Sequence, residues 1–125
     1  MEQIAKENFE LWNKALQTKD SNKVADLYDQ EATFLPTMSS DFKIGNNEAL
    51  DYFKHFLLKN PFGKIIKDKV QAISPECYIH SGMYNFEIDK DNGREKAEAR
   101  FTFIWAKNKK GEWKILHHHS SLKPI

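Results

Sequence analysis

The chain has 125 residues, 40% of them hydrophobic and 13% aromatic, which suffices for one domain with a real core and excludes a disordered tail. The 19 basic residues nearly balance the 18 acidic ones, so the formal charge is +1. This balance argues against a nucleic-acid-binding protein that depends on a broad basic surface.

Cysteine usage and the opening stretch indicate the class of protein. Cys77 is the only cysteine, so no internal disulfide can form and a reduced, cytoplasmic setting is expected. The first residues, MEQIAKENFELW, carry several charges and no long apolar run, which predicts neither a signal peptide nor a membrane anchor. Proline and glycine are few and no repeat is visible, so we expect a single domain over residues 1–125.

Helical periodicity dominates the first half of the chain. Apolar residues that recur three to five positions apart predict an N-terminal helix. Its inward stripe consists of Ile4, Ala5, Phe9, Trp12, Ala15 and Leu16. A short second helix, capped by Asp20 or Ser21, is predicted to extend to Tyr28. A strand is predicted over residues 31–35 and a third helix over residues 46–59.

After Gly63 the period of the pattern changes from helical to extended. Four strands are predicted, over residues 65–73, 77–88, 95–106 and 113–120. Helices followed by consecutive antiparallel strands predict an α+β fold. We expect a long, curved antiparallel sheet that wraps the first helix and encloses a pocket at its open end.

The last two predicted strands carry a recognisable signature, and three upstream segments agree with it. The signature comprises residues 99–105 (ARFTFIW), 111–121 (GEWKILHHHSS) and Pro124, and the upstream segments are residues 34–39, 51–57 and 80–86. These motifs resemble the SgcJ/EcaC family of the nuclear transport factor 2-like (SnoaL-like, cystatin-like) superfamily, to which the association (hub) domain of calcium/calmodulin-dependent protein kinase II is related. The resemblance implies a cone-shaped fold, homo-oligomerisation through the sheet and a deep pocket.

Three consecutive histidines, His117 to His119, stand out in the last predicted strand. Side chains alternate between the faces of a strand, so His117 and His119 are expected to share a face with Ile115, and His118 to share the other with Ser120. Imidazole can bind a metal or move protons, but no further ligands at metal-binding spacing accompany the triplet. A structural or interface role and a place in a polar pocket wall both stay open, and no metal or cofactor is predicted.

Arg100 lies between Ala99 and Phe101 in an apolar predicted strand. A buried guanidinium needs a partner, so we expect either an internal ion pair, for instance with Glu98 or Glu87, or a bound carboxylate or phosphate of a ligand. The predicted pocket residues are Arg100, His117, His119, Tyr28, Tyr84 and Thr102.

Phe101, Phe103 and Trp105 line one face of their predicted strand. Large aromatic residues on both faces of the sheet exceed what one core needs, so we interpret this face as a two-fold, sheet-to-sheet homodimer interface. His118 is assigned to the same interface. The competing interpretation is that this face completes the core of the monomer.

The leading functional hypothesis is a homo-oligomerising, hub-like domain with a small-molecule pocket and no defined catalysis. The alternative is a SnoaL-like enzyme that performs acid/base chemistry, as an isomerase, dehydratase or hydrolase, on a small apolar or polyketide-like substrate. The expected partners are further copies of the chain and a small molecule, and neither nucleic acid nor a membrane.

Overall fold

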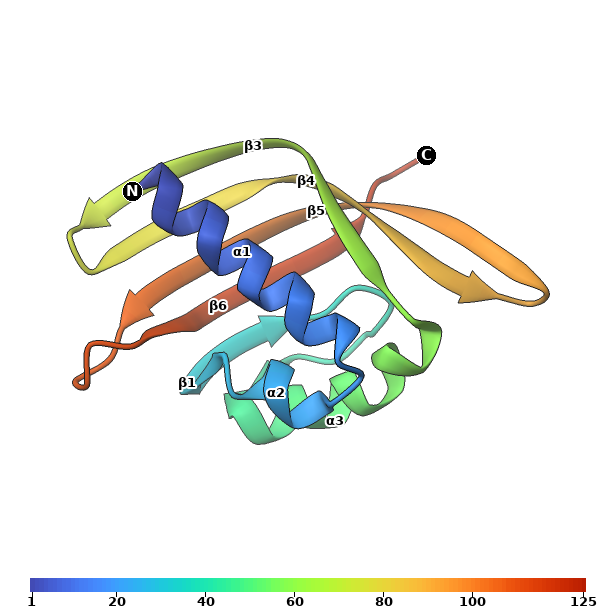
Figure 1. Cartoon of the computed structure of the whole chain (residues 1–125), viewed down its shortest axis with the longest axis horizontal. Coiled ribbons are helices and arrows are strands. Elements are labelled where there is room, and N and C mark those ends of the chain that lie inside the picture. The colour runs from blue at the N-terminus through green and yellow to red at the C-terminus, as the bar shows by residue number, and fades with distance from the viewer.

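The computed structural model describes residues 1–125 and shows helices packed against one face of a long, curved sheet (Figure 1). In chain order the elements are α1 (Glu2–Gln17), α2 (Ser21–Ala25), β1 (Tyr28–Leu35), β2 (Lys43–Ile44), α3 (Gly45–Phe56), the 3₁₀ turn η1 (Leu57–Lys59), β3 (Phe62–Ser74), β4 (Cys77–Lys90), β5 (Gly93–Lys107) and β6 (Trp113–Leu122). None of the helices is long and apolar enough to cross a membrane. The predicted α+β fold is confirmed.

The strands form one sheet in the order β2-β1-β6-β5-β4-β3. β3 to β6 form an antiparallel meander, as the sequence predicts, whereas β1 runs parallel to β6. α1 crosses the concave face of the sheet, and α2 and α3 lie at its end next to β1 (Figure 1). This arrangement leaves the opposite, convex face of β3 to β6 without a helix.

The second helix is shorter than predicted. α2 ends at Ala25, and Tyr28 is the first residue of β1. Tyr28 lies opposite Ile115 of β6, whose amide donates a hydrogen bond of 2.7 Å to the carbonyl of Leu27. Long-range strand pairing replaces the end of the helix here, because a helix this short has little stability of its own. The Asp20 cap is confirmed, since its carboxylate accepts a hydrogen bond from an amide in the first turn.

The apolar stripe of α1 packs onto the concave face of the sheet. The Trp12 ring is 1% exposed, stacks on Tyr84 and meets Phe103 edge to face. Phe9 contacts Phe101 and Phe103 in the same layer. Each aromatic pair of this kind contributes about 0.5–1.5 kcal/mol beyond the burial of its surface. The core is therefore built mainly from rings.

A β-bulge in β6 decides which of its side chains face the core. Consecutive residues of β5 lie opposite Ile115 and His117, which leaves Leu116 as an extra residue. The alternation of faces fails at this point, so that Ile115 and His118 are both buried. The expectation that Ile115 shares a face with His117 is therefore wrong.

Candidate functional site

His118 lies at the centre of a chain of hydrogen bonds inside the molecule. Trp12 Nε1 donates to the Tyr28 hydroxyl at 3.2 Å, and this hydroxyl lies 2.8 Å from His118 Nδ1, to which it directs its own hydrogen. Nδ1 then carries the lone pair of the ring, and Nε2–H donates to the Tyr84 hydroxyl at 3.2 Å. Tyr84 in turn donates to Ser120 Oγ at 2.5 Å. Ser120 Oγ also contacts Thr37 Oγ1, so every donor in this chain has an acceptor.

Aromatic surroundings keep this chain of hydrogen bonds away from water. Phe34 and Phe103 both stack on His118, with ring centroids 4.9 and 3.9 Å away. Burial holds the pKa of His118 well below its ordinary value, and the neighbouring His117 and His119 lower it further. His118 is therefore neutral at physiological pH, which agrees with the tautomer that the hydrogen bonds require.

The cavity beside His118 is almost completely filled by side chains. Its volume is about 10 Å³, which leaves room for no more than one water molecule. Tyr84 and His118 line it, and burial raises the pKa of the Tyr84 and Tyr28 hydroxyls. These groups form a packed polar core and leave no space for a ligand.

The sheet separates the predicted pocket residues into two sets. The concave side holds Tyr28 and Tyr84, and the convex side holds Arg100, Thr102, His117 and His119. These six side chains cannot line one pocket, so that prediction is wrong as a set. Arg100 is exposed to solvent and takes part in none of the ion pairs of the structure, so the expected internal ion pair is absent.

The predicted interface residues lie inside the monomer. Phe101, Phe103 and Trp105 are 4%, 1% and 1% exposed, and His118 is 2% exposed. They occupy the face that α1 covers, because Phe9 of α1 packs against two of these rings. The interface assignment is therefore corrected, and the competing interpretation, that this face completes the core of the monomer, holds.

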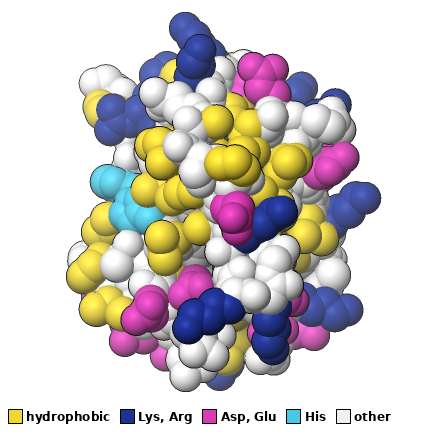
Figure 2. All heavy atoms as spheres, turned by 90° about the vertical axis from the view of Figure 1, so that its left-hand side faces the viewer, with side chains coloured by type: hydrophobic (Ala, Val, Ile, Leu, Met, Phe, Trp, Pro, Cys, Tyr) yellow, Lys and Arg dark blue, Asp and Glu magenta, His cyan; other side chains and the backbone are white.

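The convex face carries a partly apolar row of its own. This row consists of residues that lie opposite one another on neighbouring strands. It runs from Ile79 of β4 through Ile104 of β5 to His117 of β6, and Thr33 of β1 continues it. Thr33 Oγ1 and His117 Nδ1 are 2.7 Å apart, which fixes the orientation of the imidazole. Leu116, the bulged residue, is 40% exposed on the same side. At the end of the sheet where β3 meets β4, hydrophobic side chains gather on the surface with histidine beside them (Figure 2).

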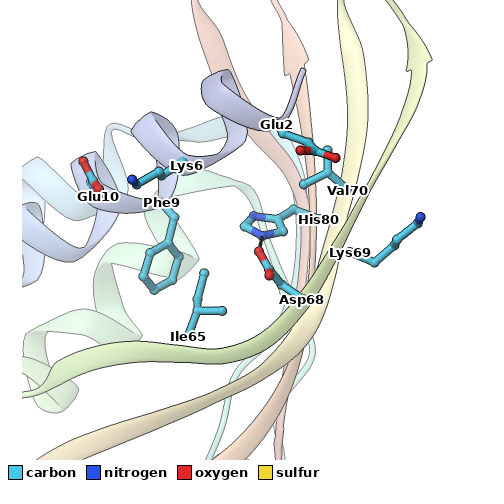
Figure 3. Close-up of a pocket in the computed structure, with 9 residues that line it drawn as sticks. All are labelled: Glu2, Lys6, Phe9, Glu10, Ile65, Asp68, Lys69, Val70 and His80. Carbon is cyan, nitrogen blue, oxygen red and sulfur yellow. Dashed lines mark hydrogen bonds and ion pairs between the residues drawn. The ribbon is translucent and has the colours of Figure 1, made fainter.

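A separate groove lies between α1 and β3. Its volume is about 530 Å³, and its wall consists of Glu2, Lys6, Phe9, Glu10, Ile65, Asp68, Lys69, Val70 and His80 (Figure 3). Nε2 of His80 lies 2.7 Å from Oδ2 of Asp68, the pair joined by a dashed line in Figure 3. The His80 side chain is 1% exposed, and its other nitrogen, Nδ1, has no hydrogen-bond partner.

Two features of the chain bring Asp68 to His80. The register of β3 against β4 shifts by a bulge at Ile66, and Gly82 of β4 lies opposite Asp68. A Cβ at Gly82 would collide with the backbone of Lys67 and Asp68, so glycine allows the two strands to approach this closely. Sequence reasoning missed the pair, because the position of a bulge cannot be read from the alternation of side chains.

Comparison with known proteins places the chain among its relatives. The sequence matches the family model of the calcium/calmodulin dependent protein kinase II association domain over residues 2–124. The chain belongs to this family. An association domain of this name from Xanthomonas campestris is 37% identical, with a TM-score of 0.89, and the match covers 93% of this chain and 83% of that one. No curated protein gives a significant match.

More distant structures share the fold of this association domain. A nuclear transport factor 2-like protein from Salmonella enterica is 17% identical, with a TM-score of 0.81, over 98% of this chain and 91% of that one. A ketosteroid isomerase-like protein from Erwinia carotovora atroseptica is 14% identical, with a TM-score of 0.77, over 96% of this chain and 94% of that one. The predicted cystatin-like, nuclear transport factor 2-like fold is thus confirmed, whereas the narrower assignment to the SgcJ/EcaC family stays a prediction.

Proposed function

We propose that this association domain assembles with further copies of itself through the convex face of its sheet. The observation that carries the proposal is the row of Ile79, Ile104 and His117 on that face, with Leu116 beside it. α1 covers the other face of the sheet and α2 and α3 lie at its end next to β1, so no helix covers the convex face of β3 to β6 (Figure 1). A sheet with one face in water normally places polar side chains on that face, so branched aliphatic residues there favour a contact surface.

The chemistry of the row suits contact between two copies. Burial lowers the pKa of His117, and the neighbouring His119 lowers it further, which favours the uncharged ring that an apolar contact requires. The charged Arg100 lies farther along β5, opposite Met83, and is suited to the rim of the contact. A two-fold axis through the convex face would bring the row of one copy against the same row of a second copy. A stable protein–protein interface buries about 1,200–2,000 Å² of accessible surface in total.

A pair of substitutions with matched chemistry tests this surface. Ile104→Lys places a charge in the middle of the row, and Leu58→Lys places the same charge on η1, where the native side chain is 77% exposed. Light scattering after gel filtration should show that Ile104→Lys lowers the mass of the assembly while Leu58→Lys leaves it unchanged, with circular dichroism confirming that both variants fold. Equal masses for the two variants would refute the proposed surface.

The groove between α1 and β3 is the small-molecule pocket in this proposal. Its volume of about 530 Å³ falls within the range of about 300–1,000 Å³ that is typical of ligand sites, whereas the interior cavity beside His118 holds only about 10 Å³. The convex face and the groove are separate surfaces, so assembly and ligand binding do not compete. The single cysteine supports a cytoplasmic setting, and neither role requires a cofactor.

Acid/base catalysis in the same groove is the second candidate function, and the pairing of His80 with Asp68 favours it. A carboxylate that holds one nitrogen of an imidazole leaves the other nitrogen to take a proton from a substrate. A SnoaL-like isomerase, dehydratase or hydrolase of this kind would act on a small apolar or polyketide-like molecule. A ketosteroid is a suitable trial substrate, given the name of the Erwinia relative.

The catalytic candidate has a direct test with a matched control. His80→Phe should abolish turnover of the ketosteroid, whereas His55→Phe should not, because His55 is exposed on α3 and lines neither the groove nor the interior cavity. Absence of turnover by the unmodified chain would refute this candidate and leave the assembly function standing.

A further inference from the structure

We propose that the groove between α1 and β3 binds a small, uncharged alcohol or phenol whose hydroxyl donates a hydrogen bond to Nδ1 of His80. The apolar body of the molecule packs on Phe9, Ile65 and Val70, which line the same groove (Figure 3). The inference rests on the proposed role of this groove as the ligand pocket, and it adds the chemical class that the groove accepts.

The hydrogen-bonding state of His80 defines what the ligand must supply. The Asp68 carboxylate is an acceptor, so it takes the hydrogen on Nε2, and the uncharged form of the ring carries its lone pair on Nδ1. This nitrogen is buried and has no partner within the protein. A buried polar atom without a hydrogen bond costs about 1–3 kcal/mol, and a donor that reaches it recovers that loss. A hydroxyl group is such a donor.

The apolar part of the wall argues for an uncharged ligand with an apolar body, whereas the other lining side chains, Glu2, Lys6, Glu10 and Lys69, carry charges of both signs. Phe9 is buried and Ile65 and Val70 are half-buried, so together they offer an apolar surface next to the imidazole. Desolvation of an ammonium group against this surface would be costly. An anion placed next to His80 would be repelled by the lone pair of Nδ1 and by the carboxylate of Asp68. A neutral hydroxyl avoids both penalties.

Access to Nδ1 requires movement at the rim of the groove, and the rim is built from free side chains. Glu2 and Lys6 stand on the first turns of α1, above His80 (Figure 3). Both are exposed, and neither side chain forms a hydrogen bond or an ion pair in the structure. Displacing them breaks no polar interaction, and exposed side chains change rotamer within nanoseconds.

Two aromatic probes that differ in a single hydrogen-bond donor test the inference. 2-Naphthol carries a hydroxyl, and 2-methoxynaphthalene has the same rings with that hydrogen replaced by a methyl group. Calorimetry on the full chain should show about tenfold tighter binding of 2-naphthol. His80→Phe keeps an aromatic ring but removes the acceptor, and it should abolish the preference. His55→Phe, the matched control on α3, should retain it.

The outcomes separate this inference from the proposal on which it rests. Equal binding of the two probes to the unmodified chain would overturn the role of His80 Nδ1 and leave the groove as a pocket. Binding of neither probe would overturn the pocket as well. If His80→Phe fails to fold, nitrogen NMR of the unmodified chain decides the question. 2-Naphthol should move the Nδ1 resonance of His80 and the methyl ether should not, and a resonance that stays in place with both probes would refute the proposal.

Discussion

The Tyr28 hydroxyl and Nδ1 of His118 lie 2.8 Å apart, although 90 residues separate them in the chain. Because Trp12 already donates to the Tyr28 oxygen, the hydrogen bonds run in one direction, through Tyr28 and His118 to Tyr84 and Ser120. The members come from α1, β1, β4 and β6, which are thereby tied together. A buried network in which every group is satisfied fixes one arrangement of the core.

Removal of the Tyr28 hydroxyl should destabilise the domain. Tyr28→Phe leaves the Trp12 indole N–H and Nδ1 of His118 without partners in a dry site, and the free energy of unfolding should fall by about 1–3 kcal/mol. Tyr52→Phe is the control, since it removes one bond to the Thr37 carbonyl at a half-buried position. Urea denaturation measures both changes. An equal or smaller loss for Tyr28→Phe would contradict the one-directional network.

Stability should decrease as the pH falls below about 6.5, the ordinary pKa of histidine. Burial lowers the pKa of His118 in the folded state, so the unfolded chain takes up the proton first and acid favours unfolding. This contribution is complete above pH 6.5 and is lost as the pH falls toward the folded pKa, with a slope of at most about 1.4 kcal/mol per pH unit for one such group.

Urea denaturation at several pH values checks this dependence. His118→Phe should be less stable at neutral pH but should show a shallower decline between pH 6.5 and 5. His117, whose pKa is also lowered, supplies part of the slope that remains. A pH profile that His118→Phe leaves unchanged would show that the buried ring is not the group responsible.

The sequence predicts the helices and strands well, but it predicts poorly which side chains point to each face of the sheet. α1 and the four strands of the meander follow from local periodicity, and the structure confirms them. The parallel pairing of β1 with β6 joins segments far apart in the chain and has no local signature. The bulge at Leu116 reverses the alternation within β6, so that His118 faces inward together with Ile115. On β5 the alternation is regular, but it does not indicate which face of the strand meets α1, and Phe101, Phe103 and Trp105 lie on the face that α1 covers.

The same limit applies to the groove. His80 and Asp68 are ordinary residues of two predicted strands, and only the bulge at Ile66 and the close approach at Gly82 bring them together. A bulge depends on the fit between strands, which a single sequence does not display. The family resemblance indicates a pocket, whereas its lining depends on these local shifts.

Gly82→Ala should disturb the groove and reduce stability. The added methyl group would collide with the backbone of Lys67 and Asp68, and strain of this kind costs about 1–3 kcal/mol. Gly93→Ala is the matched control, because a Cβ there meets nothing within 4 Å. Thermal denaturation should show a lower midpoint for Gly82→Ala alone. Equal melting midpoints for the two variants would mean that β3 moves to accommodate the methyl group at no cost. The close contact between β3 and β4 would then not hold Asp68 in place.

A contact through the convex sheet face requires that copies of this domain assemble in solution. Sedimentation equilibrium of the unmodified chain over micromolar concentrations tests it most directly. We expect a mass at least twice the 14.7 kDa of one chain. A mass of 14.7 kDa throughout the concentration range would contradict it.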